Sequence, residues 1–372
     1  MHPGANPETD RNAADSGVDA IVGTVLAEQY GINVADLAPV AVGQHTVNRR
    51  ARTEDGSRDV FVKTYVGGPD GAADLAAERA AIELATLAGD HGVPVAPAVP
   101  NLRGELIDTS TRVPLSVWEW MPGSIVAAPD PRQSAHAGET LARIHVTFAH
   151  LPASVHSDPV AATRAWRAVD ITKPLATIDQ LQALIAQRSG SGRADAFDLQ
   201  AAEDLAERRD MLNRLPVIAG QLPDRLHTQV LHGDYSPVNL LFNGDHVTAV
   251  LDFSPPRPGL ISYDLGRIAV YPTMLTGRHD WPEVALALIS AYRRTNPTAP
   301  DPDIRACIRI ALIQLVRSLY GITQHYLAPG LYQHDLDEFW RARHSAARTL
   351  WRHLTSLDDA LDDMVNHQSG TS

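Results

Sequence analysis

The stretch from Val230 to Phe253, VLHGDYSPVNLLFNGDHVTAVLDF, constrains the fold of this chain more than any other part of its sequence. Short apolar runs lie on both sides of a polar turn, and runs of this length are typical of buried strands. An Asn-Gly pair at 243–244 separates the second run from a third, which ends at Asp252. Asn-Gly between apolar runs is a strong hairpin signal. The sequence therefore predicts a small sheet with Asp234, Asn239 and Asp252 at its mouth.

These three side chains are candidates for chemistry because oxygen-bearing groups have little use in an apolar core. Carboxylate and amide oxygens suit Mg²⁺, which binds one or two carboxylates together with phosphate oxygens. The alternative is ordinary turn chemistry, since a single Asp or Asn in a turn commonly caps its own backbone. The spacing of all three residues, with a strand on each side, favours the functional interpretation.

The spacing also resembles the catalytic centre of the protein-kinase-like fold. Protein kinases have His-Arg-Asp, four residues, Asn, and later Asp-Phe-Gly. This chain has His-Gly-Asp at 232–234, four residues, Asn239, and Asp-Phe-Ser at 252–254. Glycine in place of the arginine is similar to the small-molecule branch of the fold, the aminoglycoside phosphotransferases, choline kinases and bacterial homoserine kinases. The resemblance implies an α+β, bilobal fold with a small antiparallel-sheet N-lobe and a mainly helical C-lobe.

The same resemblance implies a role for each residue of the stretch. Asp234 would orient the acceptor hydroxyl and take its proton, while Asn239 and Asp252 would hold Mg²⁺ on the phosphates of ATP. His232 would support the loop by packing and hydrogen bonding. Asp264, farther along the chain, would brace the catalytic loop without reacting.

Lys63 is one of only two lysines among 32 cationic side chains, the other being Lys173. It lies in the run Val60–Tyr65, where strand alternation puts it on one face with Phe61 and Tyr65. An edge-strand lysine in solvent is the alternative. Because arginine is the default cation of this chain, and because the position matches the order of motifs in the family, we predict that Lys63 binds nucleotide phosphates.

A helix predicted over 71–88 carries the partner that such a lysine needs. Glu78, fifteen residues after Lys63, suits the glutamate that holds the lysine in place, and Glu83 is the alternative. An ordinary acid on a helix surface is the competing interpretation. The bend at 43–48 occupies the place of a nucleotide-covering loop, but it has a single glycine, so we assign it no phosphate contact.

Extended chain runs into Met-Pro-Gly at 121–123, which is typical of a link between lobes. The resemblance implies that Glu119, Trp120 and Met121 line the nucleotide base. We expect a disordered tail over 1–16, an N-lobe over 17–120, a C-lobe over 121–360 and a C-terminal tail over 361–372.

Composition limits the partners and the location. The chain has 372 residues, enough for two lobes. Its net charge of −12, without a basic run, argues against nucleic acid as a partner. A single cysteine, Cys307, excludes an internal disulfide. The N-terminus lacks an apolar core after a basic segment and no apolar span of about 18 residues is evident, so we expect no secretory signal, no membrane span and a cytoplasmic location. The oligomeric state is unknown at this stage.

Two features bear on the acceptor. The negative net charge mildly favours a cationic small molecule, but solubility explains the charge equally well. Aromatic and acidic residues gather over 320–340 and could hold an ammonium group. Packing and a solvated helix face are the competing interpretation of that segment, and we favour it.

Together the residues and the resemblance predict an ATP- and Mg²⁺-dependent phosphotransferase that moves the γ-phosphate to a hydroxyl of a small molecule. The favoured acceptor is an antibiotic, aminoglycoside-like or another natural product, with a role in antibiotic resistance. A metabolite such as homoserine, choline or a sugar is the alternative, and a catalytically silent nucleotide-binding module is the alternative of another class. A protein kinase is disfavoured because only ten residues separate Asp252 from Tyr263. A hydrolase is disfavoured because the sequence lacks its usual motifs.

Overall fold

The computed structural model describes residues 7–40, 47–65, 74–152, 157–328 and 333–369. The chain forms two compact units, and each is described by itself. The first unit contains Met1–Gly123 and Thr248–Pro256, and the second contains Ser124–Val247 and Arg257–Ser372. The chain therefore passes from one unit to the other three times, and the short segment that carries Asp252 belongs to the first unit.

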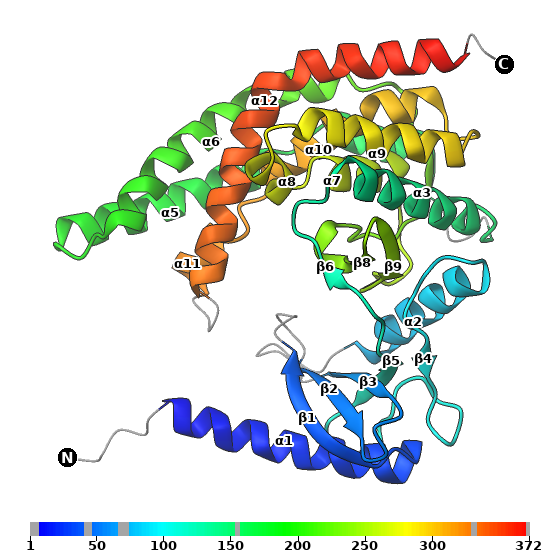
Figure 1. Ribbon diagram of the computed structural model, residues 1–372. Helices are drawn as coiled ribbons and strands as arrows, with labels where there is room; N and C mark the ends of the chain where they lie inside the picture. Colours follow the sequence, from blue (N-terminus) through cyan, green and yellow to red (C-terminus); the bar gives the residue numbers. More distant parts are fainter. Residues whose placement is uncertain (1–6, 41–46, 66–73, 153–156, 329–332, 370–372) are drawn as a thin grey trace. The chain divides into compact units, whose positions relative to one another are not determined.

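The first unit is built on a five-stranded antiparallel sheet in the order β1-β2-β3-β5-β4 (Figure 1). Its strands are β1 (Val34–Val40), β2 (Val47–Thr53), β3 (Asp59–Thr64), β4 (Ala98–Val99) and β5 (Leu115–Glu119). Along β3, Val60 and Val62 are buried in the apolar core, while Phe61 and Lys63, which alternate with them, are only half-buried. Period-two alternation therefore directs Lys63 away from the face that carries the core.

Two helices complete the first unit, α1 (Pro7–Tyr30) and α2 (Leu75–Asp90). Helix α1 lies along the sheet, and its buried residues, Val22 and Leu26 among them, join the strand residues in one apolar core (Figure 1). The helix begins at Pro7, inside the segment 1–16 that the sequence predicts to be a disordered tail. Once a helix has nucleated, each added residue costs little, which lets the amphipathic segment extend toward the N-terminus.

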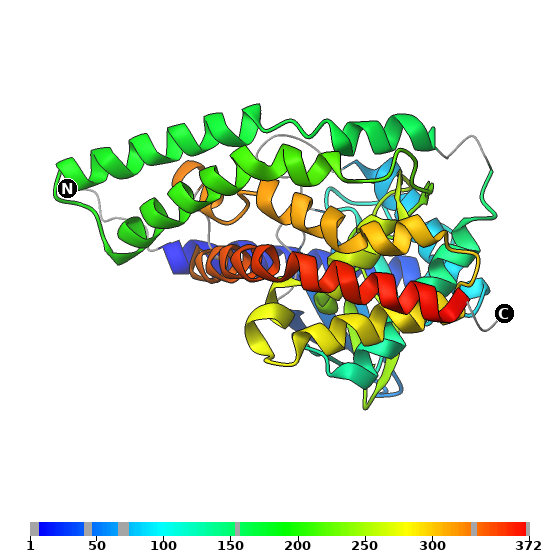
Figure 2. The same cartoon turned by 90° about the horizontal axis from the view of Figure 1, so that it is seen from above.

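The second unit is mainly helical, and helices α5 and α6 lie side by side in both views (Figures 1 and 2). Its helices are α3 (Pro131–Phe148), α4 (Pro159–Arg167), α5 (Thr172–Gly190), α6 (Ala196–Gly220), α7 (Ile261–Ala269), α8 (Pro272–Gly277), α9 (Trp281–Thr295), α10 (Asp301–Arg317), α11 (Ile322–Leu327) and α12 (Gln333–Ser369). Short strands lie among them: β6 (Ser124–Ile125), β7 (Thr228–Val230), β8 (Leu240–Asn243) and β10 (Pro258–Leu260). Strand β9 (His246–Val250) forms the predicted hairpin with β8 and carries the chain into the first unit.

Gly266 lets two helices of the second unit approach closely. A Cβ atom at this position of α7 would overlap the carbonyl oxygen of Cys307 in α10. No larger residue fits without moving one of the helices, because a backbone atom cannot rotate away as a side chain can. The contact holds α7, and with it Asp264 and Arg267, against the core of the unit.

Helix α12 extends to Ser369, into the segment 361–372 that the sequence predicts to be a C-terminal tail. Leu357, Leu361 and Val365 are buried. Their spacing of four residues puts them on one face of the helix, and burial of that face stabilises the last turns.

One helical segment, Asp301–Leu327, is long and apolar enough to cross a membrane by length and composition alone. This corrects the expectation that the sequence contains no such span. Inside the fold, 67% of its most apolar window is buried, which is also what a core helix of a soluble protein shows. The segment is therefore weak evidence for contact with a membrane.

Candidate active site

Three of the predicted residues lie together in the first unit. Lys63 Nζ is 3.2 Å from Asp252 Oδ1 and 3.4 Å from Glu78 Oε2. Strand β3 presents Lys63, and the first turn of α2 presents Glu78. Glu83, the alternative partner, is exposed on the same helix. The fold thus brings the lysine to two carboxylates, one of them 189 positions away in the sequence.

The charges of this group favour binding of phosphate. Burial acts to lower the pKa of Lys63, but the negative charges nearby, Asp252 first, outweigh it and hold that pKa above its ordinary value. The lysine therefore stays charged at neutral pH. Its side chain is 20% exposed and that of Asp252 is 58% exposed, so the carboxylate remains open to a ligand.

The backbone at Asp252 is unusual, because its φ of 56° is the one positive φ among the described residues other than glycine. Such a conformation costs about 1 kcal/mol or more in a residue with a Cβ atom, although aspartate tolerates it better than most. Backbone strain of this kind is common where a side chain must be aimed for function. Here it occurs at the residue that contacts Lys63.

The second unit holds the predicted catalytic loop, residues 231–239, which connects β7 to β8. Asp264 of α7 accepts hydrogen bonds from the backbone N–H groups of His232 at 2.9 Å and Gly233 at 3.3 Å. The N–H of Asp234 in turn donates to His232 Nδ1 at 3.2 Å. Asp264 and His232 are fully buried, so both act on the loop backbone and neither faces solvent.

Asp264 is itself held by a buried histidine. His145 Nε2 of α3 lies 3.4 Å from Asp264 Oδ2, and His145 Nδ1 lies 2.8 Å from the hydroxyl of Tyr292 in α9. The chain of contacts joins three helices to the catalytic loop. The position of the loop therefore depends on how the helices pack.

The carboxylate of Asp234 has a partner on each oxygen. Asn239 Nδ2 donates to Asp234 Oδ2 at 2.9 Å and to the backbone carbonyl of Asp234 at 2.9 Å. Arg267 of α7 forms an ion pair with Asp234 Oδ1. The side chain of Asp234 nevertheless stays 41% exposed, so it can meet a ligand in a defined orientation.

Arg267, the ion-pair partner of Asp234, was not among the residues predicted from the sequence. One signal was available, because Arg267 follows Asp264 by three residues and so lies on the same face of α7. Burial acts to lower the pKa of Arg267, and the charge of Asp234 outweighs it and raises that pKa. Arg267 therefore stays charged at neutral pH.

The residues predicted to line a nucleotide base lie at the end of β5. Glu119 is exposed, whereas Trp120 and Met121 are half-buried. The guanidinium carbon of Arg50 lies 4.3 Å over the ring of Trp120. Most of the bend at 43–48 falls in 41–46, outside the residues that the structure describes.

The predicted metal ligands differ from a histidine or cysteine site. Among the residues that the structure describes, no group of three or more His, Cys, Asp or Glu side chains could hold a metal ion. Asp252 offers an exposed carboxylate, and the amide oxygen of Asn239 is separate from the nitrogen that binds Asp234. Each of these two oxygens is of a kind that Mg²⁺ accepts, since this ion prefers oxygen ligands and takes most of them from water and phosphate.

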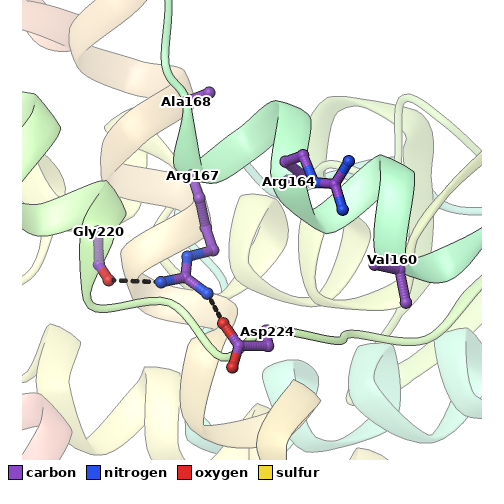
Figure 3. A pocket seen from close by; sticks show the side chains of 6 residues that line it. All are labelled: Val160, Arg164, Arg167, Ala168, Gly220 and Asp224. Carbon is purple, nitrogen blue, oxygen red and sulfur yellow. Dashed lines mark hydrogen bonds and ion pairs between the residues drawn. The ribbon is translucent and has the colours of Figure 1, made fainter.

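The second unit also contains a pocket of about 440 Å³ formed by α4 and the end of α6 with the loop after it (Figure 3). It is lined by Val160, Arg164, Arg167, Ala168, Gly220 and Asp224. Arg167 spans it, donating to the carbonyl of Gly220 at 3.4 Å and pairing with Asp224 (Figure 3). None of the predicted site residues lies in this pocket, so its volume alone does not mark a functional site.

A model of the phosphotransferase enzyme family matches residues 36–306. A homoserine kinase from Rhodopseudomonas palustris is 27% identical over 175 residues, which are 47% of this chain and 46% of that protein. A homoserine kinase from Caulobacter is 28% identical over 224 residues, which are 59% of this chain and 61% of the relative. The chain thus spans about half to three fifths of the length of these two curated relatives.

Among solved structures, spectinomycin phosphotransferase in complex with ADP and spectinomycin has a similar fold. The TM-score is 0.60 at 14% identity, and the match covers 89% of this chain and 97% of that chain. The likeness confirms the α+β, protein-kinase-like fold predicted from the sequence. The family match confirms the resemblance carried by the stretch from 230 to 253.

Proposed function

We propose, since this chain belongs to the phosphotransferase enzyme family, that it transfers the γ-phosphate of ATP to a hydroxyl group of a small molecule. The observation that supports this most is the contact of Lys63 with Asp252 and Glu78 in the first unit. A charged lysine held between carboxylates, one of them open to a ligand, suits a phosphate-binding group better than a structural ion pair.

Phosphoryl transfer asks for positioning and charge neutralisation more than for covalent chemistry from the protein. In the proposed mechanism Lys63 binds the nucleotide phosphates, and Glu78 keeps the lysine in place. Glu119, Trp120 and Met121 line the nucleotide base. These assignments follow the order of the matching motifs in the family.

Asn239 and Asp252 are the proposed ligands of Mg²⁺, which when bound neutralises phosphate charge and aligns the phosphates. Asp234 orients the acceptor hydroxyl and accepts its proton as the hydroxyl oxygen bonds to the γ-phosphorus. The bond from that phosphorus to the oxygen bridging it to the β-phosphate breaks, and ADP leaves. His232 and Asp264 support the loop that carries Asp234.

Two classes of acceptor are compatible with this mechanism. The curated relatives are homoserine kinases, and this favours a metabolite as the acceptor. The antibiotic acceptor expected from the sequence is the second candidate, and it rests on the shared fold alone. A silent nucleotide-binding module would lack turnover with either class.

A panel of hydroxyl compounds tests the proposal through acceptor-dependent release of ADP. The panel contains amino alcohols, sugars, aminoglycosides and spectinomycin, each with and without Mg²⁺. Turnover with one class identifies the acceptor. Absence of ADP release with every compound would favour the silent module.

Asp234→Asn tests the proposed base. We expect kcat to fall about 100- to 10,000-fold, because a positioned base contributes that much, while the KM for ATP changes little. Asp245→Asn, in the exposed turn that follows β8, is the matched control and should turn over normally. Near-normal turnover of Asp234→Asn would remove this residue from the mechanism.

A further inference from the structure

Two arginines of the second unit line one small cavity beside Asp234. They are Arg267 of α7 and Arg343 of α12, and the cavity has a volume of about 20 Å³. Apart from Tyr271 and Gln314, the remaining lining is apolar, and no acid contributes to it. A space of this size accepts a single small group, since about 10 to 15 Å³ already holds one water molecule.

Arg343 has hydrogen-bond donors that no described residue uses. The residue is 5% exposed, and its Nε and Nη2 atoms have no hydrogen-bond partner among the described residues. These two nitrogens form one edge of the guanidinium group, the edge that binds a carboxylate through two parallel N–H···O bonds. The Nε atom of Arg267 is likewise buried without a partner in the described part of the chain.

The charges of the two arginines are balanced differently. Arg267 forms an ion pair with Asp234, whereas Arg343 forms none with any described residue. Burial, and then the charge of Arg267, lower the pKa of Arg343 to about 10, so it still carries its charge at neutral pH. The ring of Phe339, 5.2 Å from its guanidinium carbon, offers only a partial substitute for an anion. A buried cation without an anionic partner is costly, and an anion in the cavity would remove that cost.

We propose that Arg343, assisted by Arg267, binds a carboxylate group of the phosphate acceptor. The inference rests on the proposed function and narrows its acceptor to short hydroxy acids and hydroxy amino acids. The acceptor is short because Arg267 contacts Asp234, the residue assigned to the hydroxyl, so the carboxylate and the hydroxyl lie a few bonds apart. A flat carboxylate also fits the small cavity better than a phosphate or a sugar ring. The proposed site thus binds an anionic group of the acceptor, whereas the net charge of the chain mildly favours a cationic acceptor.

Pairs of alcohols that differ only in the carboxylate test the proposal in the wild-type protein. L-Homoserine is compared with 3-aminopropan-1-ol, and 4-hydroxybutyrate with propan-1-ol, by ADP release in the presence of Mg²⁺. We expect kcat/KM to be at least about 100-fold higher for the acids. An acceptor without the carboxylate would leave the buried donors of the arginines unpaired. Equal kcat/KM within each pair would overturn the inference.

Arg343→Met removes the donor edge and keeps an unbranched side chain. The KM for the acids should rise about 100-fold, with the KM for ATP unchanged and the alcohols without a carboxylate unaffected. Arg343→Lys keeps the charge without the two-donor edge and should recover only part of the loss. Arg352→Met, an exposed arginine on the same helix, is the matched control. Equal KM values for the acids in Arg343→Met and the wild type would overturn the role of Arg343.

A binding measurement separates this inference from the proposed function. 4-Hydroxybutyrate should raise the Tm of the wild type and leave that of Arg343→Met unchanged, and no rise in the wild type overturns the inference. A rise with inorganic phosphate but not with 4-hydroxybutyrate overturns the assignment of a carboxylate. A rise with 4-hydroxybutyrate, together with no ADP release from any hydroxyl compound, overturns the proposed function and supports the carboxylate site.

Discussion

Asp252 adopts a left-handed backbone conformation with a φ of 56°, although it is not glycine, and its carboxylate contacts Lys63. Asparagine tolerates the same conformation about as well as aspartate does. A change to asparagine therefore removes the negative charge without adding backbone strain. This allows the proposed metal-binding role to be tested apart from stability.

Asp252→Asn should unfold at nearly the same urea concentration as the wild type, and its Mg²⁺-dependent turnover should fall about 100-fold or more. Asp252→Ala should lose the same activity and, in addition, about 1 kcal/mol of unfolding free energy, because alanine disfavours a positive φ. Urea unfolding and ADP release over a range of Mg²⁺ concentrations measure the two effects. A Mg²⁺ titration of Asp252→Asn that matches the wild type would contradict the metal assignment.

At the scale of elements, Asp303 in the first turn of α10 ties this helix to its neighbours. Its carboxylate accepts hydrogen bonds from the N–H of His227, before β7, at 2.9 Å and from the hydroxyl of Ser262 in α7 at 3.1 Å. The residue is buried, and burial raises its pKa from 3.8 to about 6. The packing of α7 against α10 therefore carries a dependence on pH.

The folded protein binds this proton more tightly than the unfolded chain does, so protonation of Asp303 stabilises the fold. That contribution is fully present below about pH 3.8 and is lost as the pH rises through about 6. Between these limits the unfolding free energy of the wild type should fall by about 2 kcal/mol relative to that of Asp303→Asn. The difference between the two proteins is the quantity to measure, because His344, with a pKa lowered to about 4, acts in the opposite direction over an overlapping range. Parallel pH profiles of the two proteins would contradict the assignment.

At the scale of the whole molecule, the first unit is completed by a segment from late in the chain. Residues 248–256 bring Asp252 to the unit that holds Lys63 and Glu78. A chain that ended at Gly123 would contain the lysine but not this carboxylate. The group of Lys63, Glu78 and Asp252 therefore needs a chain that continues well past the first 123 residues, to the segment 248–256.

Mg²⁺-ATP should stabilise the intact chain, because a ligand that binds only the folded state raises the unfolding free energy by about 2.7 kcal/mol at 100 times its Kd. The rise in Tm should occur in the wild type and in Lys173→Ala, an exposed lysine of α5, but not in Lys63→Ala. Removal of Mg²⁺ with EDTA should abolish most of it. An equal rise in Lys63→Ala would remove this lysine from nucleotide binding.

Much of the fold could be predicted because the periodicity of apolar residues along a short segment, and turn residues such as Asn-Gly, indicate the local secondary structure. Alternation along β3 indicated which face carries Lys63, and the Asn-Gly pair indicated the hairpin of β8 and β9. The ends of the long helices could not be predicted in the same way. Helix α12 continues as far as residue 369 because the face with Leu361 and Val365 is buried, and burial is a property of the packed molecule.

The sequence by itself determined the types and spacing of the residues that we propose carry the chemistry, from Lys63 and Glu78 to Asp234, Asn239 and Asp252. Their spacing can be recognised in the sequence because these residues lie in or next to strands, turns and helices, whose geometry is local. Only the tertiary structure decided that Arg267 pairs with Asp234 and that Arg343 lies buried beside it without an anion. Those contacts arise from the packing of α7 and α12, helices far apart in the sequence, and no local pattern encodes which side chains such packing brings together.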